Sequence, residues 1–367
     1  MSGLLSQIAS AMSFGGPSQI GIDIGAGSVK VVAIRGDAKD PKVIGVATEQ
    51  TPGGCVTDGV LGDPRSMVEV IKAALKKANV GSYQGVPANV GMRGVGVVFR
   101  RLTLPLQSPE EMASQIALEA QQQIESDLSE WIIDYQVLTS PDRQGQVAVI
   151  LVGAKRNAIE DYMQTLKLIG LQPSIFDCDI FALANAFEDS NGGPVQETTL
   201  CLDIGRDTTK FNLVQDGIPV VVRSVQSGGT HLSEMIAKAL GIDFERAEEL
   251  KILASTSDNV QKECETAIEN YIKDLLAEMK QTISFFANSN SEIKVDTIDR
   301  IVLAGGGART RGLANAMAHS FKTQVEFLDP FRRATIVPNV AATLADQAHV
   351  YAVAYGLALR RTGDREQ

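Results

Sequence analysis

Two segments of the chain share one pattern of apolar and polar residues. In the first, Ile20, Ile22 and Ile24 alternate with small or polar residues, and an apolar run over residues 29–34 follows a short turn. In the second, over residues 200–214 (LCLDIGRDTTKFNLV), an apolar run ends in an aspartate, turns at a glycine and becomes apolar again. Apolar runs bounded by glycine are typical of strands. Each segment therefore predicts two strands joined by a tight turn.

Helical periodicity marks residues 65–78 and most of residues 231–288. Between residues 85 and 169 short strands and helices follow one another closely. Within this stretch Ser108 and Glu111 predict a capping box at the start of a helix. The order of strand, strand, helix, strand, strand, helix is typical of one compact α+β unit, which we predict to be inserted into the surrounding architecture.

The two hairpin segments align with each other at an offset of 180 residues. DIGAGSVKVVAI (23–34) matches DIGRDTTKFNLV (203–214) at the aspartate, the isoleucine, the first glycine and the lysine. An apolar strand precedes each copy, and a hairpin follows each. Internal similarity of this kind indicates duplicated architecture, here two related α/β halves that face each other.

These turns carry residue types that bind phosphate. Glycines let backbone N–H groups approach phosphate oxygens, hydroxyl residues add donors, and a lysine adds positive charge. Aspartates at strand ends suit a hydrated Mg²⁺ ion, which takes only one or two carboxylates. The turns lead into strands, and GxxxxGK[ST] is absent, which excludes a Rossmann turn and a P-loop. One such turn is equally consistent with an ordinary hairpin, but two copies in register, with a triple glycine at 305–307, favour a site.

Composition narrows the class of partner. The net charge is −10, with 34 Lys plus Arg against 44 Asp plus Glu. Because cationic side chains carry most of the affinity for nucleic acid, this charge balance argues against a nucleic-acid binder. It does not exclude a small nucleotide as a ligand. The four cysteines form no CxxC pair, so neither a zinc site nor a disulfide framework is predicted, and a reducing cytoplasm is expected.

The first residues of the chain do not predict a membrane segment. No apolar run approaches the roughly 18 residues that cross a bilayer. No Lys or Arg precedes Lys30, so the start lacks the charge of a signal peptide and of a surface-seeking helix. We expect a flexible or partner-docking leader.

Together these motifs resemble the actin-like ATPase superfamily, which includes actin, the heat-shock chaperone ATPases, sugar kinases and the division protein FtsA. The resemblance implies an α/β protein with an actin-like ATPase fold of two duplicated halves and an inserted α+β subdomain. It implies ATP and Mg²⁺ as cofactors, with Asp23 and Asp203 contacting the metal through water. The implied phosphate-loop residues are Asp23, Gly25, Ala26, Gly27, Ser28 and Lys30 in the first loop, and Asp203, Gly205, Thr208 and Thr209, followed by Gly228 and Gly229, in the second.

The same resemblance implies further roles in the second half. LAGGGARTRGL is similar to an adenosine loop, with Gly305, Gly306, Gly307 and Arg309 beside the purine. Glu248 and Lys251 match a helix that closes on the ribose and base, although an i,i+3 pair is also typical of an exposed helix salt bridge.

One residue between the halves is a candidate for catalysis. Asp179 matches a polar position that orients the attacking water. From the residues alone it is equally an N-cap at the start of a helix.

The insert makes the resemblance more specific. FRRLTLP, SPEEMASQIALEAQQQIESDLSEWIIDYQVL and GGTHLSEMIAKALGIDFERAEELK are similar to the PilM family of type IV pilus assembly proteins, over about residues 19–360. This implies an ATP-binding adaptor with at most slow ATPase activity, which holds the N-terminal cytoplasmic segment of the inner-membrane protein PilN in a groove beside the insert. It also implies the PilN/PilO inner-membrane complex and pilus motor ATPases as partners, a role in twitching motility, and a cytoplasmic location peripheral to the inner membrane through a partner.

The resemblance also implies boundaries along the chain. We expect a flexible leader at 1–18, the first actin-like half at 19–84, the inserted α+β interaction subdomain at 85–169, the rest of the first half with a connecting helix at 170–198, the phosphate hairpin of the second half at 199–230, a helical subdomain closing on adenosine at 231–288, the adenosine loop at 289–330, a C-terminal helix returning to the first half at 331–361, and a tail at 362–367.

The second phosphate loop departs from the family pattern. It carries Arg206 and Asp207 where small residues are usual, so Asp207 brings negative charge toward the phosphates unless Arg206 or Mg²⁺ offsets it. Two other functions share this fold and are kept as alternatives: an actin-fold metabolite kinase and an FtsA-like filament-forming ATPase.

Overall fold

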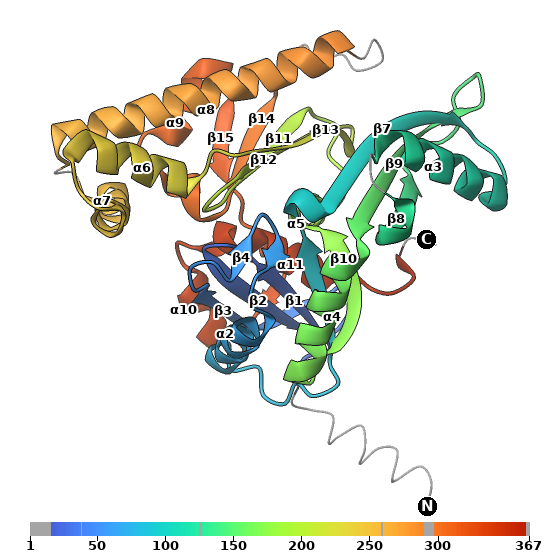
Figure 1. Cartoon of the computed structure of the whole chain (residues 1–367), viewed down its shortest axis with the longest axis horizontal. Helices are drawn as coiled ribbons and strands as arrows, with labels where there is room; N and C mark the ends of the chain where they lie inside the picture. Colours follow the sequence, from blue (N-terminus) through green and yellow to red (C-terminus); the bar gives the residue numbers. More distant parts are fainter. Residues whose placement is uncertain (1–15, 38, 125–126, 258–259, 290–296, 365–367) are drawn as a thin grey trace, which may run out of the picture. The chain divides into compact units, whose positions relative to one another are not determined.

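The computed structural model describes residues 16–37, 39–124, 127–257, 260–289 and 297–364. Most of the predicted leader and half of the predicted tail lie outside these residues. The chain forms two compact units (Figure 1). The first unit comprises the chain up to Asp179 with Thr335–Val340 and the segment from Leu357, and the second comprises Ile180–Ala334 with Ala341–Gly356.

Among the described residues, six strands form the main sheet of the first unit, in the order β10-β6-β1-β2-β3-β16. β1, β2 and β3 form an antiparallel meander, whereas β6 and β10 continue from β1 as parallel strands. Ile20, Ile22 and Ile24 are fully buried in this sheet, as their alternation predicts for a strand in contact with a core. The strand bounds are β1 Gln19–Ile24, β2 Ser28–Arg35, β3 Lys42–Gln50, β6 Pro87–Met92, β10 Gln172–Cys178 and β16 Thr335–Ile336, and a short β4 Val56–Thr57 and β5 Val60–Leu61 pair beside them.

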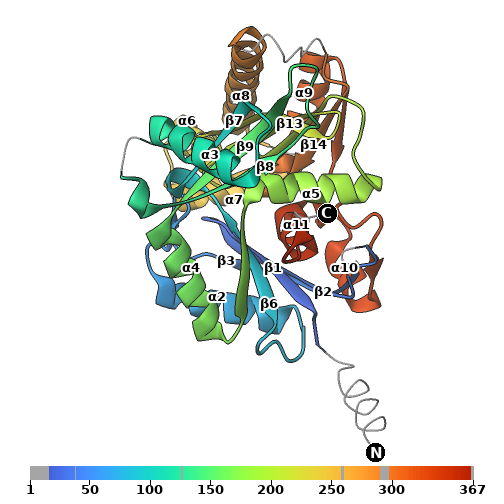
Figure 2. The ribbon, with the colours of Figure 1, turned by 90° about the vertical axis from the view of Figure 1, so that its right-hand side faces the viewer.

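Two of the described helices pack on this sheet. The α2 helix (Pro64–Lys77) begins at Asp63, whose side chain accepts from two backbone N–H groups, and α4 (Arg156–Ile169) ends at Gly170 in a left-handed conformation. Figure 2 shows α2 and α4 next to each other, and both contribute to the apolar core of the sheet.

A separate sheet of the first unit matches the predicted insert in part. In the described residues its strands are β7 (Val97–Pro105), β9 (Gln146–Lys155) and β8 (Trp131–Val137), in that order and antiparallel, and α3 (Pro109–Gln123) packs on one face. The predicted capping box between Ser108 and Glu111 is confirmed. The predicted span 85–169 is wider than this sheet, because β6 pairs with β1 and α4 packs on α2.

The second unit repeats the topology of the first. In the part of the chain that the structure describes, its sheet has the order β13-β12-β11-β14-β15, an antiparallel meander with two parallel strands beyond its first strand. The registers also match, since Asp23 lies opposite Lys30 and Asp203 opposite Lys210. The predicted duplication is therefore confirmed. The strand bounds are β11 Thr199–Ile204, β12 Thr209–Gln215, β13 Ile218–Val225, β14 Arg300–Ala304 and β15 Gln324–Phe327.

In the second unit, the described helices between residues 229 and 321 share an apolar core with the sheet. The C-terminal helix predicted over 331–361 is interrupted, because α10 and α11 are separated by a 3-10 turn. The His349 carbonyl in that turn accepts from the Gly305 N–H, so the backbone there contacts the triple-glycine loop instead of continuing a helix. The helix bounds are α5 Asp179–Asn191, α6 Gly229–Leu240, α7 Phe244–Thr256, α8 Lys262–Ser289, α9 Leu313–Phe321, α10 Pro338–Leu344 and α11 Ala352–Leu359. None of the helices in the described residues is both long and apolar enough to cross a membrane.

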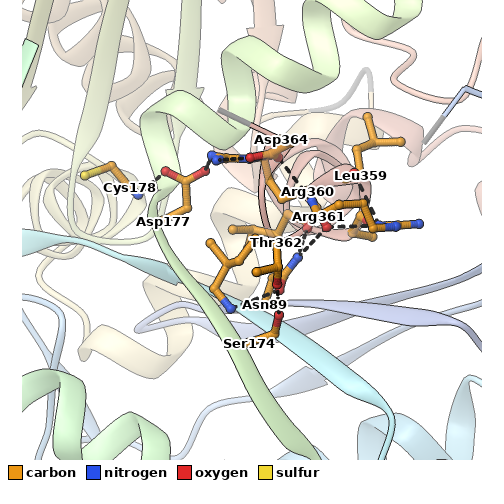
Figure 3. Close-up of polar contacts among 12 residues, drawn as sticks. Asn89, Ser174, Asp177, Cys178, Leu359, Arg360, Arg361, Thr362 and Asp364 are labelled. Atoms are coloured by element: carbon orange, nitrogen blue, oxygen red, sulfur yellow. Dashed lines mark hydrogen bonds and ion pairs between the residues drawn. The ribbon is translucent and has the colours of Figure 1, made fainter. Parts of the chain in front are cut away.

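The C-terminal segment of the chain is fastened to strands of the first unit (Figure 3). The fully buried Asn89 donates to the carbonyls of Leu357 (2.7 Å) and Arg360 (3.0 Å) and accepts from the Ile175 N–H (3.1 Å). Arg360 also pairs with the buried carboxylate of Asp177. One amide side chain thus joins β6, β10 and the residues after α11.

Replacing Asn89 with alanine should lower the free energy of unfolding by about 2 kcal/mol, because the partly buried Ile175 N–H loses its acceptor and two carbonyls lose their donor. Urea unfolding followed by circular dichroism would measure this. Ser174→Ala is the control, since the Ser174 hydroxyl contacts Thr362 at 3.5 Å at the surface and should change stability by less than about 0.5 kcal/mol. Equal stability of the two variants would contradict the role of Asn89.

Candidate functional site

Charged residues of the first unit meet where three parallel strands end. The strand order β10-β6-β1 places Asp179 just after β10, Arg93 just after β6, and Asp23 near the end of β1. Carboxyl ends of parallel strands share one edge of a sheet, which is where ligands bind in open α/β sheets. The predicted candidates Asp23 and Asp179 therefore lie on either side of an arginine that the sequence did not single out.

An ion cluster forms at this edge. Arg93 Nε lies 3.2 Å from Asp179 Oδ2, and Arg93 Nη2 pairs with Asp23 Oδ1. Lys30 Nζ lies 3.3 Å from the second oxygen, Asp23 Oδ2. The side chains are at most 15% exposed, so the ions interact in an environment of low polarity. The carboxylates of Asp23 and Asp179 are balanced in charge by Lys30 and Arg93.

The turn between β1 and β2 is fixed by backbone hydrogen bonds. The Gly25 N–H donates to the Ser28 carbonyl (3.1 Å), while the buried Thr51 hydroxyl donates to the Gly25 carbonyl (2.7 Å). The Thr51 N–H donates to the Gly27 carbonyl (3.2 Å). A Cβ at Gly25 would lie 3.0 Å from the Ser28 carbonyl oxygen, so the close turn favours glycine. Ala26 completes the predicted loop.

The hairpin of the second unit repeats the ion pair. Lys210 Nζ lies 2.8 Å from Asp203 Oδ2, at the position that corresponds to Lys30 and Asp23. The Gly205 N–H donates to the Thr208 carbonyl (2.9 Å), and the buried Thr209 hydroxyl donates to the Ser227 carbonyl.

The start of α6 lies against this turn. The Gly229 N–H donates to the Gly205 carbonyl at 3.0 Å. A Cβ at Gly228 would lie 2.6 Å from the Arg206 carbonyl oxygen, so the approach requires a residue without one. The structure thus brings the predicted glycines 205, 228 and 229 together.

The charged dipeptide Arg206–Asp207 has local partners. The Thr230 N–H donates to the Arg206 carbonyl (2.7 Å), and the Thr230 hydroxyl donates to Asp207 Oδ1 (2.8 Å). The carboxylate of Asp207 is therefore engaged at the first turn of α6, where the helix dipole favours negative charge.

Glu248 and Lys251 lie beside the start of α6. Lys251 Nζ donates to the Gly229 carbonyl (3.0 Å) and pairs with Glu248, which also accepts from the Ser233 hydroxyl. Burial acts to raise the pKa of Glu248, but the hydrogen bonds from Lys251 and Ser233 outweigh it, so this pKa lies below its usual value. Glu248 is thus charged at neutral pH, and Lys251 is directed at the glycine turn.

The triple glycine packs against the second hairpin. Gly305 has φ +83°, and a Cβ there would lie 2.5 Å from the Ile204 carbonyl oxygen and overlap Asp203. A Cβ at Gly307 would overlap the Ile204 side chain, whereas one at Gly306 would meet nothing within 4 Å. The close approach of Gly305 and Gly307 leaves no room for side chains, and Gly306 presents open backbone.

Arg309 lies beside a small cavity. Its guanidinium donates to the Asp346 carbonyl and lies 5.2 Å from the centre of the Phe327 ring. The cavity has a volume of about 200 Å³, and its lining includes Ser255, Arg309 and Phe327. That volume is below the roughly 300–1,000 Å³ of sites that enclose a drug-sized ligand, so the cavity suits part of a ligand only.

The donor set is poorly suited to a directly bound Mg²⁺ ion. Both oxygens of Asp23 and one oxygen of Asp203 are paired with cationic side chains. Within the described ranges, no three His, Cys, Asp or Glu residues cluster as a metal site. A water-mediated Mg²⁺ at Asp23 and Asp203 stays a prediction.

Sequence reasoning missed Arg93, Thr51 and Lys210. Lys210 carried a signal, because it matches Lys30 in the internal repeat. Arg93 and Thr51 carried none, since their role depends on which strands and loops become neighbours.

Solved proteins share this architecture. The ethanolamine utilization protein EutJ from Carboxydothermus hydrogenoformans has a TM-score of 0.57 and 17% identity, covering 93% of this chain and 88% of that chain. MreB5 of Spiroplasma citri bound to ADP has a TM-score of 0.52 and 12% identity, covering 95% and 97%. The fold is therefore that of the actin-like ATPases, as predicted.

The chain belongs to the family of type IV pilus assembly protein PilM, whose model matches residues 21–362. A chain of the solved PilM–PilN type IV pilus biogenesis complex is 26% identical, with a TM-score of 0.82, covering 94% of this chain and 98% of that chain. The family resemblance inferred from the sequence motifs is confirmed.

Gly305→Ala should lower the free energy of unfolding by more than about 3 kcal/mol, because a left-handed backbone with a Cβ costs roughly 1–2 kcal/mol and overlap with Asp203 and Ile204 adds to it. Gly306→Ala is the matched control and should change stability by less than about 1 kcal/mol. Urea denaturation of both variants tests this, and similar midpoints would show that the loop does not pack as described.

Proposed function

We propose that this chain is an ATP-binding adaptor of type IV pilus assembly that binds the N-terminal cytoplasmic segment of PilN. The observation that carries the proposal is the family match over residues 21–362. The similar chain from the PilM–PilN complex supports PilN as the partner. The resemblance to the PilM family implies that PilN is an inner-membrane protein. The adaptor is therefore peripheral to that membrane and contacts it only through PilN. Through PilN it is also connected to PilO and to the pilus motor ATPases.

ATP binding is supported by the repeated hairpins. Backbone N–H groups of Gly25, Ala26, Gly27 and Gly205, with the hydroxyls of Ser28, Thr208 and Thr209, are the proposed phosphate donors. Lys251 and Glu248 serve the ribose, and Gly306, with its open backbone, lies against the base.

The state of Asp179 supports slow hydrolysis. A carboxylate that orients an attacking water must reach that water, but Asp179 Oδ2 lies 3.2 Å from Arg93 Nε. The ion pair occupies this carboxylate oxygen, so an attacking water must compete with Arg93 for it. We therefore infer that nucleotide state, rather than rapid turnover, controls the adaptor, since a ligand shifts a conformational equilibrium through differential affinity.

A synthetic peptide of the PilN N-terminal segment should bind the purified full chain at least about tenfold more tightly than a scrambled peptide of the same composition, a difference of about 1.4 kcal/mol. Fluorescence anisotropy with and without ATP measures this affinity and its coupling to nucleotide. Equal binding of the two peptides would reject the adaptor, and substrate-dependent ADP production from a small molecule would favour the kinase instead.

Lys251→Ala should weaken ATP binding about tenfold, because it removes the cation fixed at the Gly229 carbonyl. Lys238→Ala on α6 is the control, since that side chain is exposed and lies outside the group of site residues. Isothermal titration calorimetry measures the ATP affinity of both variants. Unchanged affinity in Lys251→Ala would remove Lys251 from the site.

A further inference from the structure

Arg93 stands in the middle of the three strand ends that form the candidate site. Its strand, β6, lies between β1 and β10 in the sheet, so its side chain reaches a carboxylate on each side. Arg93 Nη2 pairs with Asp23 and Arg93 Nε lies 3.2 Å from Asp179. One guanidinium therefore holds Asp23, which the sequence suggested for metal, and Asp179, which it suggested for water chemistry.

Burial makes this arrangement electrostatically important. The side chains of Asp23 and Asp179 are 6% and 5% exposed, and two such carboxylates close together need a cation or a proton. A hydrated Mg²⁺ ion could supply that charge through one or two carboxylates. Here Arg93 supplies it instead, and Lys30 adds a second positive charge at Asp23.

The same cations adjoin the turn expected to hold phosphate. A Cβ built on Gly25 would lie 3.5 Å from Arg93 Nη1 and 3.6 Å from Lys30 Nζ. A guanidinium has five N–H donors, so it can hold carboxylates and still donate to a phosphate oxygen.

We propose that Arg93 is a resident cation of the nucleotide site, which replaces a metal ion at Asp23 and Asp179 and lets this chain bind ATP without Mg²⁺. The inference has two parts. The first, that Arg93 occupies the two carboxylates, is independent of ATP binding. The second, that ATP binds without Mg²⁺, rests on the proposed function. Two measurements on the full chain separate these parts.

The first measurement uses the metal alone. Mn²⁺ is titrated into nucleotide-free protein, and free Mn²⁺ is followed by electron paramagnetic resonance. Arg93→Gln should bind Mn²⁺ at least about tenfold more tightly than the wild type, because two carboxylates lose their shared cation. Arg93→Lys, which keeps the charge, and Arg65→Gln, an exposed arginine on α2, should remain like the wild type. Equal Mn²⁺ affinity in Arg93→Gln and the wild type would overturn the proposal.

The second measurement compares ATP affinity in Mg²⁺ and in EDTA by isothermal titration. Wild-type affinity should change less than about threefold, whereas Arg93→Gln should lose about tenfold or more in EDTA and recover in Mg²⁺. A wild type that loses more than about tenfold in EDTA would overturn the proposal. Absence of ATP binding in both buffers would overturn the proposed function and the nucleotide part of this inference, and the Mn²⁺ titration would still decide whether Arg93 occupies the carboxylates.

If Arg93→Gln folds poorly, a double variant still tests the proposal. Arg93→Gln with Asp179→Asn removes the cation together with one carboxylate and so restores the charge balance. It should be more stable than Arg93→Gln and should bind Mn²⁺ no better than the wild type. Tight Mn²⁺ binding by the double variant would contradict the assignment of Asp179 to this cluster.

Discussion

A guanidinium between two buried carboxylates fixes the edge of the first sheet on which the candidate site is built. Asp23, Arg93 and Asp179 come from three strands that are distant in sequence and adjacent in the sheet. Leaving either carboxylate without its cation would cost several kcal/mol, because a buried charge loses hydration that only a partner replaces. The ion cluster thus constrains the strand ends, and the buried Asn89 fastens the same strands β6 and β10 to the C-terminal segment.

The two duplicated units share the same strand order but differ in the residue that follows the parallel strand beside the first hairpin. Each has an aspartate opposite a lysine in the first hairpin, with matched register. Beside the first strand lies β6 in one unit and β14 in the other, and their ends differ: Arg93 follows β6, whereas Gly305 follows β14. One unit therefore places a cation where the other places bare backbone, which approaches Asp203 too closely for any side chain.

Local patterns in the sequence were enough to predict the hairpins, the duplication, the capping box at Ser108 and the glycine turns. These features depend on residues within a few positions of each other or on a direct internal repeat. The extent of the insert could not be predicted, because β6 and α4 resemble its own elements and only their partners assign them to the larger sheet. Arg93 was missed for the same reason: an arginine after a short strand is unremarkable until β6 is known to lie between β1 and β10.

Cations placed close to the candidate site matter because the chain as a whole is negatively charged. With a net charge of −10, the protein as a whole repels a polyphosphate at long range. At physiological ionic strength that repulsion is screened beyond about 8 Å, so affinity depends on charges close to the ligand. Lys30 and Arg93 lie beside the first turn, and Lys251 is held at the Gly229 carbonyl. A phosphate group at the first turn would lie beside Lys30 and Arg93, and it would compete for Arg93 with Asp23 and Asp179. That competition would link occupancy of the turn to the ends of β1, β6 and β10 in the first unit.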